Sequence, residues 1–513
     1  MTRRPLLHRL LPASLGLALA ACAPAADRDE ALDLVLANGR VMDPESGLDA
    51  TRNVGIKDGK IAAISEGRLT GARVIDVGGR VIAPGFIDLH SHGHNALIGG
   101  RVQAFDGVTT SLEAEAGQLP IDAAYRRAAE EGRAINYGFT ASWLAARIAV
   151  MGGVEPDGSF DGFKKLLAAP GWADVEATDE QVDRILERVD AGLAQGAIGI
   201  GFLLGYAAGT TNAEVRRVSE LAAERQVVTF VHTRSTVPAD SANEEVIAAA
   251  QATGARWHLC HASASDRRQL VQRLIEARSE GAKLTAEVVT SNGGSTFIDA
   301  VFLRPENWER AGGRPDWIIY YGRRLGSFEE LGRVQRDDPS AMVVIDPLGR
   351  PTDDTDPERR ALMADLIKSD WAIASDAMPW SDSTGNPLPV ETWPLPETAW
   401  AHARSASNFT RAIQKYAMEW QLVSLMDVIR AAALHPALVL EETVPQLKNK
   451  GRVKLGADAD LIVFDPAQVR FNATQERPAQ ISTGMEYVLV NGTLLIDQGR
   501  LDPTAHPGQP IRR

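Results

Sequence analysis

The chain is poor in cysteine, in positive charge and in long apolar runs, and each shortage excludes a class of protein. Only Cys22 and Cys260 occur among 513 residues, so we expect no framework of intramolecular disulfides. The net charge of -13 argues against nucleic acid as a partner, because phosphate binding requires a basic face. It also disfavours anionic membranes as a docking surface. The content of 44% hydrophobic and 24% charged residues is ordinary for a soluble globular protein.

The first 22 residues differ in composition from the rest of the chain. Arg3 and Arg4 give a basic start, and the apolar stretch that ends at Ala21 is too short to cross a bilayer. This pattern predicts a signal peptide over residues 1–22. Leu-Ala-Ala before Cys22 resembles a bacterial lipobox, which predicts lipidation of Cys22 and a mature chain tethered on the periplasmic side of a bacterial membrane. An ordinary cleaved signal, with Cys22 incidental, is the alternative.

Short β-like runs lie at both ends of the mature chain. After a polar linker at 23–31, the runs of residues 32–84 are separated by NG, DG and GG turn signals. Residues 450–513 also contain short β-like runs separated by turn signals, with a second NG turn at Asn491-Gly492. We therefore expect the two ends to form one small β-sandwich.

Residues 85–449 alternate β-like runs with stretches whose apolar residues recur at helical spacing. This alternation predicts a (β/α)8 TIM-like barrel, with a doubly wound sheet as the alternative. A stretch rich in Gly, Pro, Trp and Tyr, about 291–353, interrupts the pattern and is expected to form a lid. The eight expected strands lie around Ile82–His90, Val108–Glu115, Ile135–Ala141, Ala197–Leu204, Val227–His232, Trp257–His261, Leu284–Val289 and Trp371–Asp376.

Five of these runs end in potential metal ligands, and their barrel-like order argues for a binuclear metal site. His90 and His92 are two residues apart, so both imidazoles lie on one side of an extended strand end. The other ligands close runs whose carboxyl ends open toward a barrel's active face. The runs are FIDLHSH, TTSLEAE, VVTFVH, RWHLCH and WAIASD, and the candidate ligands are His90, His92, Glu113, Glu115, His232, His261 and Asp376.

Asp376 is the candidate for proton transfer. A carboxylate at that strand end can bind the ion held by the first two histidines, take a proton from water and return it to a leaving amine. A helix N-cap is the alternative role. His94 is expected in a loop, behind the ligands or facing solvent. We expect His258, which faces away from His261, and Cys260, a buried strand thiol, to be structural.

The motifs APGFIDLHSH, DGVTT, RIAVMGG, GAIG, HTR, SDAMP, HARSASNF and GADADLIVFDP follow one another along the chain. From about Leu32 to Arg512 the chain resembles the N-acyl-D-amino-acid deacylase (D-aminoacylase) branch of the amidohydrolase superfamily. The resemblance implies a zinc-dependent barrel with one tight metal, a second weaker metal and a bridging hydroxide that attacks the amide of a small substrate, here an N-acyl amino acid. The expected ligands are His90, His92 and Asp376 for one ion and Glu115, His232 and His261 for the other.

The chain also departs from this family. The family's metal-bridging cysteine is replaced within Glu115-Ala116-Gly117, so an oxygen ligand is expected in its place. Glu115, nearer the strand end, is the expected bridge and Glu113 the alternative. The family's lysine for the substrate carboxylate falls at Ser263, and its tyrosine stretch falls at Val289-Thr290-Ser291. These departures leave the substrate and its stereochemistry open.

Other candidates for substrate binding lie outside the ligand set. Arg234 and Arg404 match family positions, and each either holds an anionic substrate group or forms a structural ion pair. Tyr320 and Tyr321 in the lid are candidate oxyanion donors. Two other functions stay open: a cyclic-amide hydrolase or dipeptidase on the same scaffold, and a catalytically inactive metal-dependent binding lipoprotein. The presence of Asp376 beside all the histidines argues against the inactive protein.

Overall fold

Eight parallel strands form the central sheet in a computed structural model of the chain, which describes residues 31–234, 240–262 and 267–513. The strands lie side by side in the order in which they occur along the chain. Each coincides with one of the eight expected runs, so the barrel prediction is confirmed. They are β6 (Phe86–Asp88), β7 (Val108–Gln118), β8 (Asn136–Ser142), β9 (Ile200–Phe202), β10 (Val228–Val231), β11 (Arg256–Leu259), β12 (Lys283–Val288) and β17 (Ala372–Ile373).

The ring closes through the residues that follow β6 and β17. The backbone N–H of Asp376 donates to His90 O over 2.8 Å, and that of His92 donates to Ala377 O over 2.8 Å. Ser91 and Ala377 form a parallel bridge between the same two segments. The backbone bonds that close the barrel therefore also hold His90, His92 and Asp376 next to one another.

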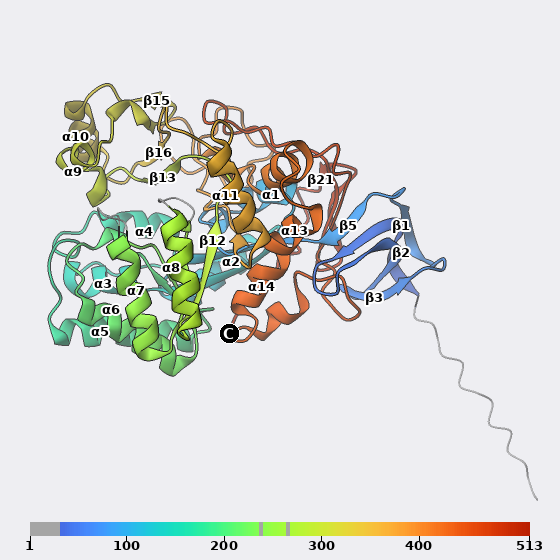
Figure 1. Ribbon diagram of the computed structural model, residues 1–513, viewed down its shortest axis with the longest axis horizontal. Coiled ribbons are helices and arrows are strands. Elements are labelled where there is room, and N and C mark those ends of the chain that lie inside the picture. The colour runs from blue at the N-terminus through green and yellow to red at the C-terminus, as the bar shows by residue number, and fades with distance from the viewer. Residues whose placement is uncertain (1–30, 235–239, 263–266) are drawn as a thin grey trace, which may run out of the picture. The chain divides into compact units, whose positions relative to one another are not determined.

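Helices follow most of the strands, and α5 to α8 pack side by side outside the barrel (Figure 1). The α5 helix shows why these segments are helical: a capping box between Thr178 and Gln181 begins it, and it buries an apolar stripe. In the described part of the chain, no helix is long and apolar enough to cross a membrane. The helices around the barrel are α1 (Leu97–Phe105), α2 (Ile121–Glu131), α3 (Trp143–Gly152), α4 (Phe160–Leu167), α5 (Asp179–Ala194), α6 (Asn212–Arg225), α7 (Asp240–Thr253), α8 (Arg267–Ser279), α11 (Pro357–Lys368), α12 (Phe409–Arg411), α13 (Leu425–Ile429) and α14 (His435–Leu440).

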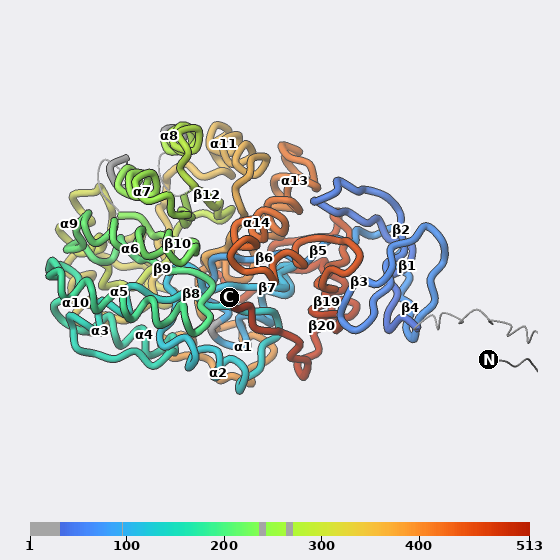
Figure 2. The backbone as a smooth tube through the Cα atoms, turned by 90° about the horizontal axis from the view of Figure 1, so that it is seen from below, coloured from blue at the N-terminus to red at the C-terminus, as the bar shows by residue number. Residues whose placement is uncertain are grey.

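Both ends of the chain share one nine-stranded sheet (Figure 2). Antiparallel pairing of β5 with β18 joins the N-terminal strands to the C-terminal ones. Asn491 and Gly492 have φ of 48° and 78°, as the expected NG hairpin turn between β19 and β20 requires. The strands are β1 (Leu32–Asp43), β2 (Leu48–Lys57), β3 (Lys60–Ser65), β4 (Gly71–Asp76), β5 (Val81–Pro84), β18 (Leu461–Phe464), β19 (Met485–Val490), β20 (Thr493–Asp497) and β21 (Arg500–Leu501).

The run from Ile82 to His90 proves to be two strands that belong to two sheets. It passes from β5 in the terminal sheet to β6 in the barrel at Gly85. A Cβ on Gly85 would lie 2.2 Å from the Thr109 side chain. Only glycine therefore lets the backbone pass this close to β7 as it leaves one sheet for the other.

The interrupting stretch folds around a small sheet of its own, in the order β13-β16-β14-β15. It has a separate apolar core, which includes Ile298, Leu331 and Val343. Tyr206, between β9 and α6, links it to the barrel through a 2.6 Å hydrogen bond with Thr296. The elements of this lid are β13 (Gly294–Phe297), α9 (Pro305–Arg310), β14 (Ile318–Tyr320), β15 (Arg323–Arg324), α10 (Phe328–Asp337) and β16 (Met342–Ile345).

Candidate metal centre

The six candidate ligands come together at the carboxyl ends of the barrel strands. Two groups form, and within each the potential ligand atoms lie within 4.8 Å of one another. The groups are the two that the sequence suggests, although they come from five different strands. The first contains His90, His92 and Asp376, and the second contains Glu115, His232 and His261.

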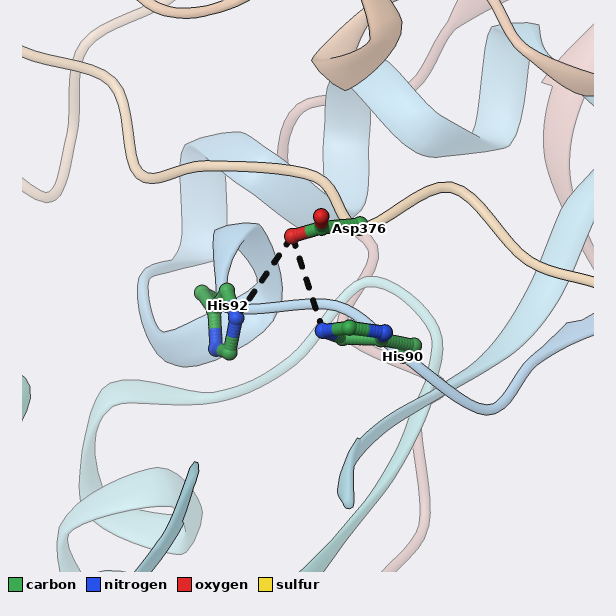
Figure 3. A group of neighbouring side chains, drawn as sticks. All are labelled: His90, His92 and Asp376. Carbon is green, nitrogen blue, oxygen red and sulfur yellow. Dashed lines mark ion pairs between the residues drawn. The ribbon is translucent and has the colours of Figure 1, made fainter. Parts of the chain in front are cut away.

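In the first group, one carboxylate oxygen faces two imidazoles (Figure 3). Asp376 Oδ1 lies 3.5 Å from His90 Nε2 and 3.7 Å from His92 Nε2. All three side chains are buried. His90 Nε2 makes no hydrogen bond with any described residue, although it is completely buried. A buried nitrogen whose neighbours are other ligand atoms is the arrangement expected where a cation binds.

Glu115 lies between the two groups and turns one oxygen toward each. Its Oε2 is 3.2 Å from His90 Nε2 and 3.7 Å from His92 Nε2. Its Oε1 is 2.9 Å from His261 Nε2 and 3.1 Å from His232 Nδ1. Glu115 would therefore face an ion held by either group.

Glu113 has a different position, behind the histidines. His92 Nδ1 donates to Glu113 Oε1 over 2.9 Å, which turns His92 Nε2 toward the centre. Carboxylates that accept from the outer nitrogen of a ligand histidine fix its tautomer and orientation. The geometry therefore favours Glu115 over Glu113 as the ligand.

Glu287, in β12, plays the same part for His90, and sequence analysis missed it. His90 Nδ1 donates to Glu287 Oε1 over 2.6 Å, and the backbone N–H of His261 donates to the same oxygen over 2.8 Å. His258 Nε2 lies 3.1 Å from Glu287 Oε2. His258 thus contacts the carboxylate that holds His90 and is not one of the grouped candidate ligands. The available signal was a lone acidic residue in the apolar run LTAEVV.

The electrostatics of the cluster favour positive charge beside its carboxylates. Burial lowers the pKa of His92, but attraction to Glu113 outweighs it and raises the pKa to about 10. Burial raises the pKa of Glu115, but the charges of His90, His232 and His261 outweigh it and hold that pKa well below its usual range. Buried imidazole nitrogens and carboxylate oxygens at these spacings fit a divalent metal such as zinc.

Two candidate ligands hold strained backbone conformations. His261 has φ of 33° and Asp376 has φ of 50°, in the left-handed region that non-glycine residues rarely adopt. Such strain costs on the order of 1–3 kcal/mol and persists where the surrounding structure enforces it, often at functional sites. With these backbone conformations, the side chains of His261 and Asp376 each belong to one of the two ligand groups.

Both candidate arginines are occupied by protein groups. Arg404 Nε donates to Asp376 O over 2.6 Å, and its Nη2 lies 2.6 Å from Asp376 Oδ2. Arg234 pairs with Glu245 over 2.8 Å and also donates to three backbone carbonyls, including that of Thr210. Arg234 thus fits the role of a structural ion-pair partner, whereas Arg404 pairs with Oδ2 of Asp376, the candidate for proton transfer.

The lid tyrosines do not fit the oxyanion role expected of them. Tyr320 donates to Asp338 within the lid, and Tyr321 faces a cavity beside the centre. Tyr206 is instead the tyrosine next to a ligand, with its ring 5.1 Å from that of His232. His94 is buried against Phe139 and bonded to Ser91 O over 2.8 Å, so of its two expected positions, behind the ligands or facing solvent, the second is excluded. Two further candidates, Ser263 and Cys22, lie outside the described residues.

A cavity of about 170 Å³ is lined by Met378, two residues beyond Asp376, and by Phe139, whose ring stacks on His94. None of the six candidate ligands lines it. Trp380 and Trp400 line it from the segment after β17, and Tyr321 lines it from the lid. An apolar cavity near 150 Å³ accommodates a benzene-sized group, so this one can hold a short acyl chain or a ring.

Comparison with known proteins agrees with this geometry. A family model described as "Amidohydrolase family" matches residues 73–208. The chain is 28% identical to N-acyl-D-glutamate deacylase and 25% identical to D-aminoacylase, both from Alcaligenes xylosoxydans xylosoxydans; the alignments cover 94% and 90% of this chain and 97% and 93% of those proteins. The crystal structure of N-acyl-D-glutamate deacylase from Bordetella bronchiseptica, complexed with zinc and a phosphonate inhibitor, superposes with a TM-score of 0.74 at 22% identity, covering 94% of this chain and all of that one. The chain is therefore similar to the amidohydrolase family over residues 73–208 and to the two deacylases along nearly its whole length.

Proposed function

We propose that this protein hydrolyses the amide bond of N-acyl amino acids, with zinc as its metal. The observation that carries the proposal is Glu115, which turns one carboxylate oxygen toward each group of histidines while Asp376 completes the first group. The deacylase relatives support the class of substrate, and the zinc complex of the solved relative supports the metal.

The residues at the centre divide the chemistry between them. Bound divalent ions would supply a Lewis acid that polarises the scissile carbonyl and makes water more acidic. Asp376 Oδ1 faces the centre, so it takes a proton from the attacking water as the new C–O bond forms. When the C–N bond breaks, the same oxygen gives that proton to the departing nitrogen. The products are a carboxylate and an amine.

Arg404 orients Asp376 for this role. It binds Oδ2 and the backbone carbonyl of the same residue, so the carboxylate keeps Oδ1 turned toward His90 and His92. Arg234 is bonded through Nε and both Nη atoms, whereas Arg404 Nη2 pairs with Asp376 without a hydrogen bond among the described residues.

The cavity beside Met378 is the proposed site for the acyl group. Its lining combines the aromatic Trp380, Trp400 and Tyr321 with charged side chains such as Arg133. Against the aromatic part, each buried methylene contributes about 0.8 kcal/mol, or about fourfold in kcat/KM. We therefore expect longer or aromatic acyl groups to be preferred over acetyl. Trp380→Ala should reduce that preference, because the tryptophan lines the cavity.

A substrate panel tests the proposal. The zinc-loaded protein is assayed with N-acyl-D-amino acids, N-acyl-L-amino acids, dipeptides and cyclic amides, each with short and long apolar groups. Turnover of an N-acyl series supports the proposal. Turnover of cyclic amides or dipeptides alone would favour the other hydrolase. Full metal content without turnover of any compound would favour a binding lipoprotein.

Asp376→Asn tests the proton transfer in the same assay. Asparagine keeps the shape and a weak oxygen ligand but cannot accept the proton, so kcat should fall by about 10²- to 10⁴-fold. Circular dichroism should stay unchanged, and metal should still bind at the Glu115 group. Asp365→Asn, at an exposed position on α11, is the matched control. Near-normal kcat in Asp376→Asn with metal bound would remove Asp376 as the base.

A further inference from the structure

Cys260 follows β11 directly and lies at the metal centre, although the sequence suggested only a packing role. It is 2% exposed and belongs to the apolar cluster that includes Leu89 and Phe230. Its Sγ, a ring nitrogen of His90 and a carboxylate oxygen of Glu115 all lie within 4.8 Å of one another. These three atoms form a third group with metal-ligand spacing, and this group shares a residue with each of the other two.

His90 gives an independent sign that an ion binds beside Cys260. Its Nε2 is fully buried and has no hydrogen-bond partner among the described residues, even though Glu115 Oε2 is 3.2 Å away. Glu287 holds the opposite nitrogen of the ring, which keeps Nε2 turned toward Glu115 and Asp376. An ion bound at this nitrogen would have Glu115 as its neighbour, and both residues are grouped with the Cys260 sulfur.

We propose that Cys260 Sγ binds the metal ion held by His90 and Glu115, giving the centre a mixed nitrogen, oxygen and sulfur ligand set. The inference rests on the proposed metal-dependent function. On binding, the S–H bond breaks, its proton passes to solvent and a sulfur lone pair forms the bond to the ion, without any redox change. A thiolate ligand favours softer ions such as zinc and cadmium over manganese.

Cobalt substitution tests this directly, because thiolate bound to Co²⁺ gives a near-ultraviolet charge-transfer absorption. The chain has two cysteines, so each can be removed in turn. We expect the absorption in the wild type and in Cys22→Ser, and its loss in Cys260→Ser. Visible cobalt bands and metal analysis report occupancy separately from the thiolate signal.

The relative affinity for soft and hard ions separates a ligand from a residue that only positions one. Outer residues typically alter metal affinity by about 10- to 100-fold regardless of the metal's softness. If Cys260 is a ligand, Cys260→Ser should weaken Cd²⁺ binding by more than this and Mn²⁺ binding by less than tenfold. Similar losses for both ions would overturn the inference.

The outcomes also separate this inference from the proposed function. Cobalt bound to the Cys22→Ser protein without the near-ultraviolet absorption would exclude Cys260 as a ligand and leave the metal site intact. Absence of cobalt binding would contradict both proposals. Since Cys260 is the remaining cysteine in Cys22→Ser, this comparison decides the question even if Cys260→Ser fails to fold.

Discussion

At the residue scale, two glutamates on one strand face have separate roles. Glu115 faces both histidine groups, whereas Glu113 accepts from the outer nitrogen of His92. The sequence placed both on the same face, but strand alternation alone does not say which carboxylate reaches the centre. The orientation of the His92 ring decides which glutamate is the ligand, and this orientation depends on contacts between strands.

Metal content of two variants tests this assignment. Glu115→Gln should lose metal at both positions, since the amide removes the charge between them. Glu113→Gln should weaken binding by about 10- to 100-fold and recover at high zinc, because the amide oxygen still accepts from His92. Metal per protein after dialysis against graded zinc measures both, with exposed Glu130→Gln as control. Full occupancy in Glu115→Gln at low zinc would refute the bridging role.

The supporting residues act through contacts between distant segments. Glu287, which sequence reasoning missed, reaches His90 from 197 positions away. Arg404 was named as a candidate, but its pairing with Asp376, 28 positions away, was not predicted. The ligands themselves were predictable because they end apolar strands that a barrel must bring together. The supporting contacts were not, because a lone glutamate or arginine gives no periodic signal.

At the element scale, the junction between barrel and terminal sheet depends on a buried ion cluster. Lys450 is 4% exposed, and its Nζ lies 2.6 Å from Asp460 and 2.9 Å from Asp458. Asp460 also accepts from Asn136 in β8 over 2.9 Å and from the backbone of Asn491 over 2.7 Å. Lys450 thus pairs with both carboxylates, and Lys60 also pairs with Asp458.

Lys450→Met should therefore destabilise the fold by about 3–5 kcal/mol, because it leaves the buried Asp460 carboxylate without its ion-pair partner. Lys454→Met is the matched control: Lys454 is 41% exposed and pairs with Glu45, so its loss should cost about 1 kcal/mol or less. Thermal and urea unfolding at pH 7 measure the difference. Equal stability of the two variants would contradict a structural role for the cluster.

The deficit should also depend on pH with a definite sign. Burial raises the pKa of Asp458, but Lys450 outweighs it and holds that pKa below the ordinary value of 3.8. A lowered carboxyl pKa adds stability that is present above the unfolded value and is lost as pH falls through the folded value. The gap between wild type and Lys450→Met should therefore shrink below pH 3.8.

At the scale of the whole molecule, the sequence predicted the architecture because its main signals are local. NG turns and short alternating runs marked the terminal strands, and apolar runs between helices marked the barrel. The sequence predicted that both ends of the chain form one β-sandwich, but not that β5 pairs with β18, because this register joins segments at opposite ends of the chain. The small sheet of the lid went unforeseen because Gly and Pro in that stretch obscured its strands.

The attachment of the molecule to a membrane is a separate prediction that depends on Cys22. The net charge of -13 gives no electrostatic attraction to an anionic leaflet, so a lipid on Cys22 would have to provide the anchor. Cys22→Ala should therefore move the protein from the membrane fraction to the soluble fraction of a bacterial host. Cys260→Ala, which removes the other cysteine, should leave it with the membrane. If Cys22→Ala stays in the membrane fraction, the protein is held there by something other than this cysteine.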